Sequence, residues 1–278
     1  MILFINPEKA RLNYLKLKEA LPNAIIAYAI KANYDKKILS ALAKEGCAAE
    51  VCSDYEHIIA KKAGFKRIIR NGFGKLRAAW LTNVEDVNAP VMGMKGARLH
   101  LNEKSKMGID EKELLKHKWD CIAFHTRDGF KEALKKAENI AAKTGAGFID
   151  VGGGINEERI KLLKGKENII VEPGRYLVED ACEVVSKVLA VKGDKIIIDC
   201  GMNFLNKFSN SRFVVTAQGK KNRSYKVFGP IPTDIDNIGV HNLPELKAGD
   251  EVIIKNAGAY TLSMASAWTR PLPKIRYV

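Results

Sequence analysis

The amino-acid sequence predicts an α/β protein in which a parallel (β/α)8 barrel is followed by an antiparallel β domain. Three observations carry this prediction. The chain has 278 residues, 46% of them hydrophobic and 28% charged, which suffices for one large domain or two modest ones. Short apolar runs alternate with amphipathic stretches up to about residue 175. After residue 180 the helical periodicity gives way to short strands.

The predicted barrel strands are apolar runs rich in Ile, Val and Ala, at residues 25–30, 48–52, 67–70, 89–92, 97–101, 121–124, 147–151 and 169–171. The predicted helices between them include residues 35–45, 54–63, 111–117, 129–143 and 157–164. Residues 94–96 leave almost no room for a helix between the fourth and fifth strands. An open doubly wound sheet is therefore the competing architecture.

The second domain is predicted from short strands separated by Gly, Asn and Pro, at residues 184–189, 195–198, 213–216, 225–228 and 252–255. The boundary falls near residues 177–183. We therefore expect a barrel domain over residues 1–180 and a β domain over residues 181–278. Residues 1–6 form a first strand that could join the β domain.

Composition excludes several classes of protein. No apolar run approaches the ~18 residues of a membrane span, and the apolar start is interrupted at once by Pro7 and Glu8, so we expect a cytoplasmic protein. The five cysteines are odd in number and include no CxxC, which favours reduced thiols over disulfides or a metal site. The net charge of +14 is spread along the chain, which favours a solvated basic surface over nucleic-acid binding.

Four short motifs end predicted strands and would share one rim of a barrel, where active sites of this fold lie. They contain Lys31, His125, the glycines 152–154, and Glu172 with Arg175. Barrel closure would set Glu172 near Lys31 and Arg175 near the glycines. A lysine amine, a carboxylate and a glycine loop that can bind a phosphate are the groups that pyridoxal phosphate needs, although a sugar-phosphate enzyme would use similar groups. Singly, each motif also has an ordinary structural explanation, such as a snorkelling lysine or a flexible turn.

The ordered motifs resemble the fold-type III pyridoxal-phosphate decarboxylases, the group that contains the diaminopimelate and ornithine decarboxylases. The resembling segments are YAIKAN (28–33), EVCSDYE (50–56), NGFGK (71–75), SKMGI (105–109), AFH (123–125), DVGGG (150–154), EPGRY (172–176), DCGMN (199–203), GPIPTDID (229–236) and NAGAY (256–260). They span nearly the whole chain in order. The resemblance implies a barrel that carries the cofactor, a β domain, and a homodimer with shared active sites.

The resemblance also implies a role for each matching residue. Lys31 matches the lysine that binds the cofactor covalently, His125 the histidine that stacks on its ring, and Glu172 the glutamate that keeps the pyridine nitrogen protonated. Gly152, Gly153, Gly154 and Arg175 match the phosphate-binding groups, and Tyr260 matches the tyrosine near the phosphate. Glu50 stands at the usual aspartate position and Glu56 at the usual glutamate position.

Three departures from the family pattern concern substrate and proton transfer. The segment between Lys75 and Arg98 is compressed, and the histidine motif continues as Thr-Arg-Asp rather than Gly-Ser. Pro232 stands where the family usually has a cysteine, and proline cannot donate a proton. In the same loop, Thr233, Asp234 and Asp236 are the predicted ligands for a substrate amino group.

The sequence therefore predicts a homodimeric decarboxylase of a basic or diamino acid, with pyridoxal 5′-phosphate as cofactor and no bound metal. DCGMN resembles the diaminopimelate branch, which implies a place in lysine biosynthesis. An amino-acid racemase of the same fold and a non-catalytic homologue that binds the cofactor are the alternatives.

Overall fold

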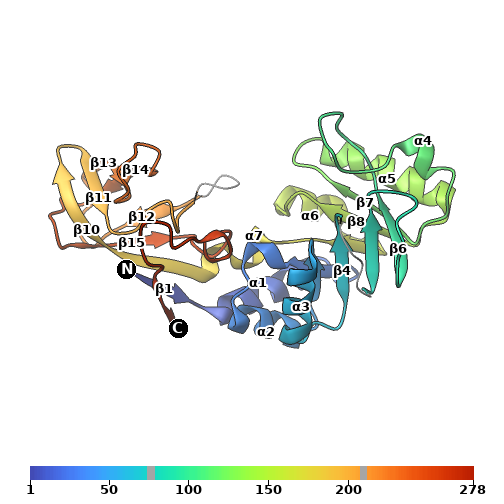
Figure 1. The fold of residues 1–278 in the computed structure, drawn as a ribbon, viewed down its shortest axis with the longest axis horizontal. Helices are drawn as coiled ribbons and strands as arrows, with labels where there is room; N and C mark the ends of the chain where they lie inside the picture. Colours follow the sequence, from blue (N-terminus) through green and yellow to red (C-terminus); the bar gives the residue numbers. More distant parts are fainter. Residues whose placement is uncertain (74–78, 207–211) are drawn as a thin grey trace. The chain divides into compact units, whose positions relative to one another are not determined.

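The computed structural model describes residues 1–73, 79–206 and 212–278 and divides into two compact units (Figure 1). The barrel unit comprises residues 11–177. The β unit comprises residues 1–10 and 178–278. The chain therefore passes between the units twice, once within helix α1 (Pro7–Ala20) and once after Leu177.

The barrel unit contains the predicted closed parallel barrel. Its strands are β2 (Ile25–Ala29), β3 (Ala48–Val51), β4 (Ile68–Asn71), β5 (Leu81–Val84), β6 (Met94–Arg98), β7 (Cys121–His125), β8 (Phe148–Gly152) and β9 (Ile169–Val171). The last strand pairs with the first, with Ile25 opposite Ile170. This closure rules out the open doubly wound sheet. It also brings the segments that follow β2 and β9 to neighbouring positions on one rim.

Two strand predictions need correction. Residues 89–92 are not a strand, because β5 lies earlier, at Leu81–Val84, and the predicted fifth strand 97–101 is β6 at Met94–Arg98. Pro90 offers no backbone N–H for a ladder, whereas Asn83 makes the true strand look polar in sequence. A side chain at Gly96 would meet Asn83 Oδ1 at 2.1 Å, so the small residue in β6 makes room for this buried amide.

The helices mostly follow the predicted periodicity. Those of the barrel unit are α2 (Lys36–Lys44), α3 (Asp54–Ala63), α4 (Glu111–Leu114), α5 (Phe130–Thr144), α6 (Glu157–Leu163) and the short α7 (Arg175–Val178), which ends in the β unit. Helix α4 is shorter than the predicted 111–117, and α1 was not predicted. Helix α5 packs on β7 and β8. The helices therefore connect and brace the strands, as expected of a (β/α)8 barrel.

One end of the barrel interior is an apolar layer. Its buried residues are Ala27, Ala48, Ile69, Leu81, Cys121 and Ile170, with Ile25, Trp80, Met94 and Phe148 packed against them. The edges of Trp80 and Phe148 meet in a T-shaped contact with ring centroids 5.7 Å apart. This layer closes the bottom of the barrel, so polar chemistry is confined to the other end.

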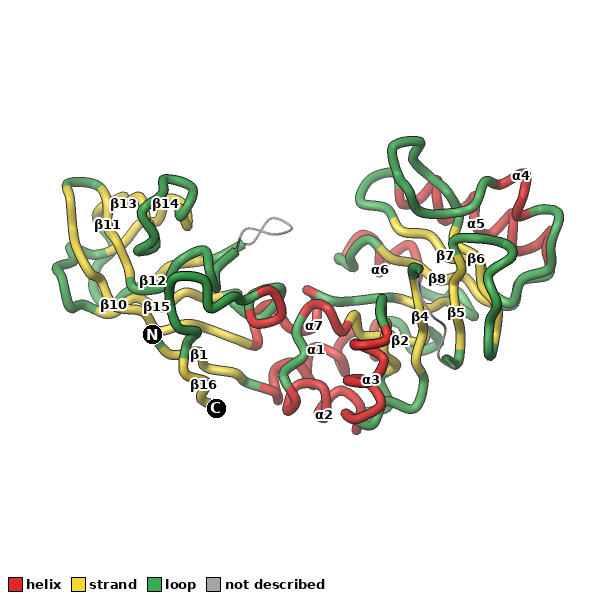
Figure 2. The backbone as a smooth tube through the Cα atoms, in the orientation of Figure 1, coloured by secondary structure: helices red, strands yellow, loops and turns green. Residues whose placement is uncertain are grey.

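The β unit is a mostly antiparallel sheet, as predicted (Figure 2). Its strands are β1 (Ile2–Ile5), β10 (Cys182–Lys192), β11 (Lys195–Ile198), β12 (Val214–Thr216), β13 (Arg223–Phe228), β14 (Asn237–Leu243), β15 (Glu251–Lys255) and β16 (Lys274–Tyr277). Strands β14 and β16 were not predicted. Two pairs are parallel, β1 with β16 and β11 with β13. Strand β1 is held between β10 and β16.

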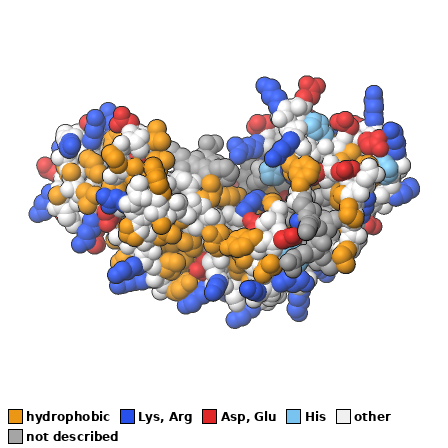
Figure 3. Space-filling view, in the orientation of Figure 1, with side chains coloured by type: hydrophobic (Ala, Val, Ile, Leu, Met, Phe, Trp, Pro, Cys, Tyr) orange, Lys and Arg blue, Asp and Glu red, His pale blue; other side chains and the backbone are white. Residues whose placement is uncertain are grey.

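The surface carries its positive charge in a dispersed way. Figure 3 shows Lys and Arg side chains scattered over the visible face of each unit rather than gathered in one patch. Among the helices that the structure describes, none is long and apolar enough to cross a bilayer.

The start of α2 fixes the segment that follows Lys31, and its cap is testable. The Asp35 carboxylate accepts the backbone N–H groups of Lys37 and Ile38 at 2.9 and 3.1 Å. We expect Asp35→Ala to lower the free energy of unfolding by ~1 kcal/mol, because two helix N–H groups lose their acceptor. Asp35→Asn, which keeps an acceptor, should cost less. Urea denaturation measures both; equal stability of the parent and Asp35→Ala would contradict the capping role.

Candidate active site

A layer of polar side chains lies directly above the apolar layer of the barrel. Each comes two residues after an apolar residue of the same strand or its extension, and therefore points to the same face. Glu50 follows Ala48, Asn71 follows Ile69, Asn83 follows Leu81, Asp150 follows Phe148, and Glu172 follows Ile170. Glu50, Asn83 and Asp150 are almost completely buried. The polar layer therefore stands at the carboxyl end of the strands, where the sequence predicted the site.

Lys31 lies at this rim in a single 3₁₀ turn, Ile30–Ala32, which directly follows β2. Its Nζ forms an ion pair and hydrogen bond with Glu50 Oε2 and lies 3.3 Å from Cys52 Sγ. The loss of water around the ammonium would lower the pKa of Lys31, but the combined effects of Glu50, Cys52 and Glu172 outweigh this, and the pKa rises well above its ordinary value. Lys31 is therefore a protonated amine with a fixed carboxylate partner.

Two asparagines connect the three carboxyl groups of the site. Asn71 Nδ2 donates to Glu50 Oε1 at 3.1 Å and to Glu172 Oε1 at 2.6 Å. Asn83 Nδ2 donates to Asn71 Oδ1 at 3.0 Å and to Asp150 Oδ2 at 2.7 Å. The amides thus hold the carboxyl groups in one hydrogen-bonded layer.

The carboxyl groups differ in charge because one lysine cannot balance three of them. Burial raises the pKa of Glu50, but Lys31 and the hydrogen bonds from Lys31, Cys52 and Asn71 reverse this, so the net shift is downward. Burial and the nearby Glu172 carboxyl raise the pKa of Asp150 well above its ordinary value. Burial and the charge of Glu50 raise the pKa of Glu172 to about 7. The layer therefore contains a carboxylate, a protonated acid and a group that titrates near neutrality.

His125 and the glycine run meet beside this layer. His125 ends β7 and pairs in register with Gly152 of β8. A Cβ at Gly152 would lie 2.6 Å from His125 Nδ1 and 3.0 Å from Glu172 Oε2, so only glycine leaves room for both side chains. Burial and the positive charges of Arg98 and Lys31 lower the pKa of His125 to about 4. The imidazole is therefore neutral at physiological pH.

Arg159 holds the glycine loop in place through hydrogen bonds to backbone carbonyl oxygens. Its guanidinium donates to the carbonyl oxygens of Gly154 at 2.6 Å, Thr126 at 3.0 Å and Arg127 at 2.7 Å. It also lies over the Phe130 ring at 4.5 Å. Arg159 is almost fully buried. One side chain therefore ties the loop after β8 to the loop after β7.

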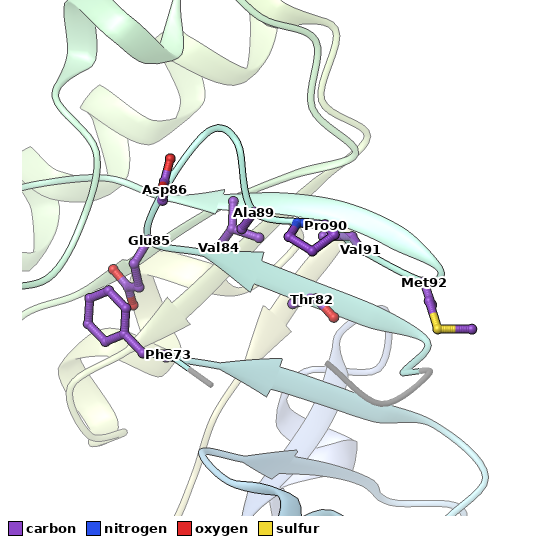
Figure 4. A pocket seen from close by; sticks show the side chains of 10 residues that line it. Phe73, Thr82, Val84, Glu85, Asp86, Ala89, Pro90, Val91 and Met92 are labelled. Carbon is purple, nitrogen blue, oxygen red and sulfur yellow. The ribbon is translucent and has the colours of Figure 1, made fainter. Parts of the chain in front are cut away.

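A cavity of about 570 Å³ lies elsewhere on the barrel unit (Figure 4). It is lined by Gly72, Phe73, Thr82, Val84, Glu85, Asp86, Ala89, Pro90, Val91 and Met92. Residues 89–92, the misplaced strand, form one side of it. Its described lining shares no residue with the polar layer around Lys31, although Gly72 follows Asn71 and both Thr82 and Val84 flank Asn83.

Comparison with known proteins decides the family. The family model "Pyridoxal-dependent decarboxylase, pyridoxal binding domain" matches residues 9–89. A diaminopimelate decarboxylase from Helicobacter pylori strain J99 is 31% identical over 350 residues, which cover 95% of this chain and 86% of the relative. The chain belongs to the pyridoxal-dependent decarboxylase family. A diaminopimelate decarboxylase from Aquifex aeolicus is 26% identical over 332 residues, covering 90% of this chain and 79% of that protein.

Solved structures of the family agree with the fold. The crystal structure of a diaminopimelate decarboxylase mutant from Helicobacter pylori, complexed with L-lysine, has a TM-score of 0.85 at 27% identity. The match covers all of this chain and 91% of that one. The alignment with the J99 relative extends over 350 positions, more than the 278 residues present here, so this member of the family lacks internal segments.

Pyridoxal phosphate is the cofactor of the family, and the barrel unit fits it. The barrel rim carries a primary amine, Lys31, after β2 and a glycine loop at the end of β8. Gly153 and Gly154 have φ of +99° and +93°, which favour glycine. A Cβ at Gly153 would meet the Thr126 carbonyl oxygen at 1.8 Å, whereas nothing would lie within 4 Å of a Cβ at Gly154. Such a loop suits a phosphate. Arg175 begins α7 immediately after β9 and its loop, at the same rim.

The β unit holds the remaining predicted residues. Both Asp236 carboxylate oxygens accept backbone N–H groups, from Met202 at 2.6 Å and Ile231 at 2.9 Å, and the residue is almost fully buried. Asp236 therefore holds the loop 229–236 in shape, whereas Asp234 is exposed and Thr233 is partly exposed. Tyr260 has φ of +61°, an uncommon conformation for a large residue. Within NGFGK, residues 74 and 75 lie outside the described residues.

Sequence reasoning gave no role to four residues of the site, Asn71, Asn83, Asp150 and Arg159. Asn83 was hidden because its strand was misplaced, and Asn71 was quoted only as part of a motif. A polar residue two positions after a core residue would have revealed both. Arg159 gives no such signal, because its sequence context matches that of any basic residue on an amphipathic helix. Glu56 was named, and its carboxylate accepts the Cys52 backbone N–H at 2.7 Å.

The raised pKa of Glu172 predicts a pH dependence of stability. Because the folded state of the cofactor-free protein binds this proton more tightly than the unfolded chain does, the stabilisation is complete below about pH 4.5. It is lost as the pH rises through about 7. Glu172→Gln removes the titrating group. Relative to this variant, we expect the parent to lose stability on going from acidic to neutral pH.

Urea denaturation of the cofactor-free proteins measures this difference, with the exposed substitution Glu167→Gln as a matched control. A constant difference in stability between the parent and Glu172→Gln across this pH range would contradict the raised pKa.

Proposed function

We propose that this protein decarboxylates a diamino acid, diaminopimelate, with pyridoxal phosphate bound at Lys31. The observation that carries the proposal is the Lys31–Glu50 pair in a layer of three carboxyl groups at the barrel rim. Its support is a relative, 31% identical over 95% of the chain, that is named diaminopimelate decarboxylase.

The residues of the barrel unit divide the tasks of binding. Lys31 holds the cofactor covalently, and Gly152–Gly154 with Arg175 bind its phosphate. The neutral His125 ring stacks on the cofactor ring. Glu172 would keep a proton at the pyridine nitrogen; its own pKa of about 7 would fall beside such a cation, as for any carboxyl group next to a positive charge.

The reaction follows from these positions. When bound, pyridoxal phosphate withdraws electrons from the α-carbon of the amino acid, so that its carboxylate can leave as carbon dioxide. Glu172 supports this by retaining the proton at the pyridine nitrogen. Glu50 fixes the Lys31 amine, and Asn71 keeps Glu50 and Glu172 apart at fixed positions. Arg159 keeps the phosphate loop in one conformation.

We expect the covalent attachment to occur at Lys31. Borohydride reduction of the holoenzyme followed by peptide mapping should place the label on this residue, and Lys31→Ala should bind cofactor without a reducible bond. Lys36 and Lys37, close by at the start of α2, are the internal controls. A label on another lysine would remove Lys31 from this role.

The reaction itself is tested by measuring carbon dioxide release from a panel of amino acids. We expect release from diaminopimelate above lysine, ornithine and arginine. Chiral chromatography of the recovered substrate tests the racemase alternative. Racemisation without carbon dioxide, or cofactor binding without either reaction, would overturn the proposal.

We also propose a homodimer in which the loop 229–236 of one chain completes the site of its partner. Its exposed acid, Asp234, would hold the distal amino group of the substrate by a charge-assisted hydrogen bond. Thr233 would contribute a hydroxyl. Asp236 is left out of this role, because its oxygens hold the loop.

Subunit mixing tests the shared site. Inactive Lys31→Ala chains and inactive Asp234→Ala chains should regain about a quarter of the parent activity, because random exchange makes about half the dimers hybrid and each hybrid has one intact site. Mixing Lys31→Ala with Lys31→Ala is the control. No recovery after verified subunit exchange, or an active monomer by light scattering, would contradict the shared site.

A further inference from the structure

Cys52 is a titratable group of the site to which the mechanism above gives no task. It directly follows β3, two residues after Glu50, and precedes the Ser53 cap of α3. Its Sγ lies 3.3 Å from Lys31 Nζ and donates a hydrogen bond to Glu50 Oε1 at 3.0 Å. Its backbone N–H donates to Glu56 Oε2 at 2.7 Å, which fixes its position. The thiol is thus held against the lysine that carries the cofactor.

Cys52 differs from the other cysteines of the chain in its access to the site. Cys47, Cys121, Cys182 and Cys200 are buried, whereas Cys52 is exposed. A buried cysteine is usually a small apolar core residue. Cys52 has polar partners instead, and both partners belong to the reacting end of the barrel.

The thiol of Cys52 retains its proton at neutral pH. Although the residue is exposed, the loss of water around its sulfur and the negative charge of Glu50 raise the pKa of Cys52, and the opposing effect of Lys31 is smaller. Glu50, which contacts the same Lys31 nitrogen, has a lowered pKa and is a proton acceptor. His125 is neutral. Among the described contacts of Lys31 Nζ, Cys52 is therefore a neutral acid that can donate a proton, whereas Glu50 is a carboxylate that can accept one.

We propose that Cys52 is the acid that protonates the α-carbon after carbon dioxide has left. This inference rests on the proposed decarboxylation. The substrate amine displaces Lys31 from the cofactor, so the substrate nitrogen replaces Lys31 Nζ and the α-carbon is the next atom. Cys52, in contact with Lys31 Nζ, is within reach of that region.

The proton transfer balances. Cleavage of the bond to the carboxylate leaves an electron pair on the α-carbon; the S–H bond of Cys52 breaks, and this pair forms the new C–H bond. The thiolate then takes a proton from the Lys31 ammonium, 3.3 Å away. That step leaves Lys31 as the neutral amine that displaces the product, and solvent supplies the net proton. Pro232 has no proton to give, so the barrel unit supplies its own donor.

The test compares Cys52→Ala and Cys52→Ser with the parent holoenzyme. We expect both variants to bind the cofactor at Lys31, seen in its absorbance spectrum, and to lose ~10²–10⁴-fold in kcat. We also expect a larger share of turnovers to end in pyridoxamine phosphate and an aldehyde, because the proton then reaches a carbon of the cofactor instead. Cys47→Ala, a buried cysteine away from Lys31 Nζ, is the matched control and should keep the parent ratio.

The outcomes separate proton donation from positioning. Serine keeps the hydrogen bonds but is a far weaker acid, so rescue of turnover by Cys52→Ser would overturn the proposal in favour of a positioning role. Parent-like kcat with no increase in pyridoxamine phosphate would also overturn it, as would loss of the cofactor spectrum in both variants. If the parent itself releases no carbon dioxide, the proposed function fails first, before Cys52 is in question.

Discussion

The site depends on an imbalance of charge inside the barrel. Three carboxyl groups, Glu50, Asp150 and Glu172, share one hydrogen-bonded layer. Among the described residues, Lys31 forms an ion pair with one of them, Glu50, while Arg98 lowers the pKa of Glu172 without such a contact. Isolated buried carboxylates are costly, so those without a cation retain protons. Glu50 forms the ion pair with Lys31 and stays ionised, Asp150 stays protonated, and Glu172 titrates near pH 7. A carboxyl group that titrates there suits the role proposed for Glu172 beside a cationic ring nitrogen.

This imbalance can be tolerated because the fold separates two kinds of interior. The apolar layer around Ile69 and Leu81 supplies the stability of the barrel, and the polar layer begins only two residues later on the same strands. Asn71 and Asn83 donate hydrogen bonds to one oxygen of each carboxyl group without adding charge. On each of these strands, one residue packs in the apolar layer and the residue two positions later carries a polar side chain of the site.

The closed barrel, and the rim that collects Lys31, His125 and Glu172, could be predicted from sequence because strand ends and barrel closure are local and topological properties. The place of Asn83 in the site could not be predicted, because this buried amide makes its own strand, Leu81–Val84, look like a loop. The more apolar run at residues 89–92, which contains Pro90, resembles a strand more closely. Arg159 and the loop-holding role of Asp236 depend on which backbone groups the folded chain brings near them. No local pattern encodes such long-range partners, and the same holds for the contact of Cys52 with Lys31.

Strand β1 has a consequence for the order in which the chain can fold during synthesis. It pairs with β10 and β16, both of which lie beyond residue 181. The barrel unit, in contrast, is one continuous segment, residues 11–177. On a translating ribosome the barrel can therefore close while β1 is still unpaired, and the apolar strand Ile-Leu-Phe-Ile stays open to wrong pairing at least until β10 has been synthesised.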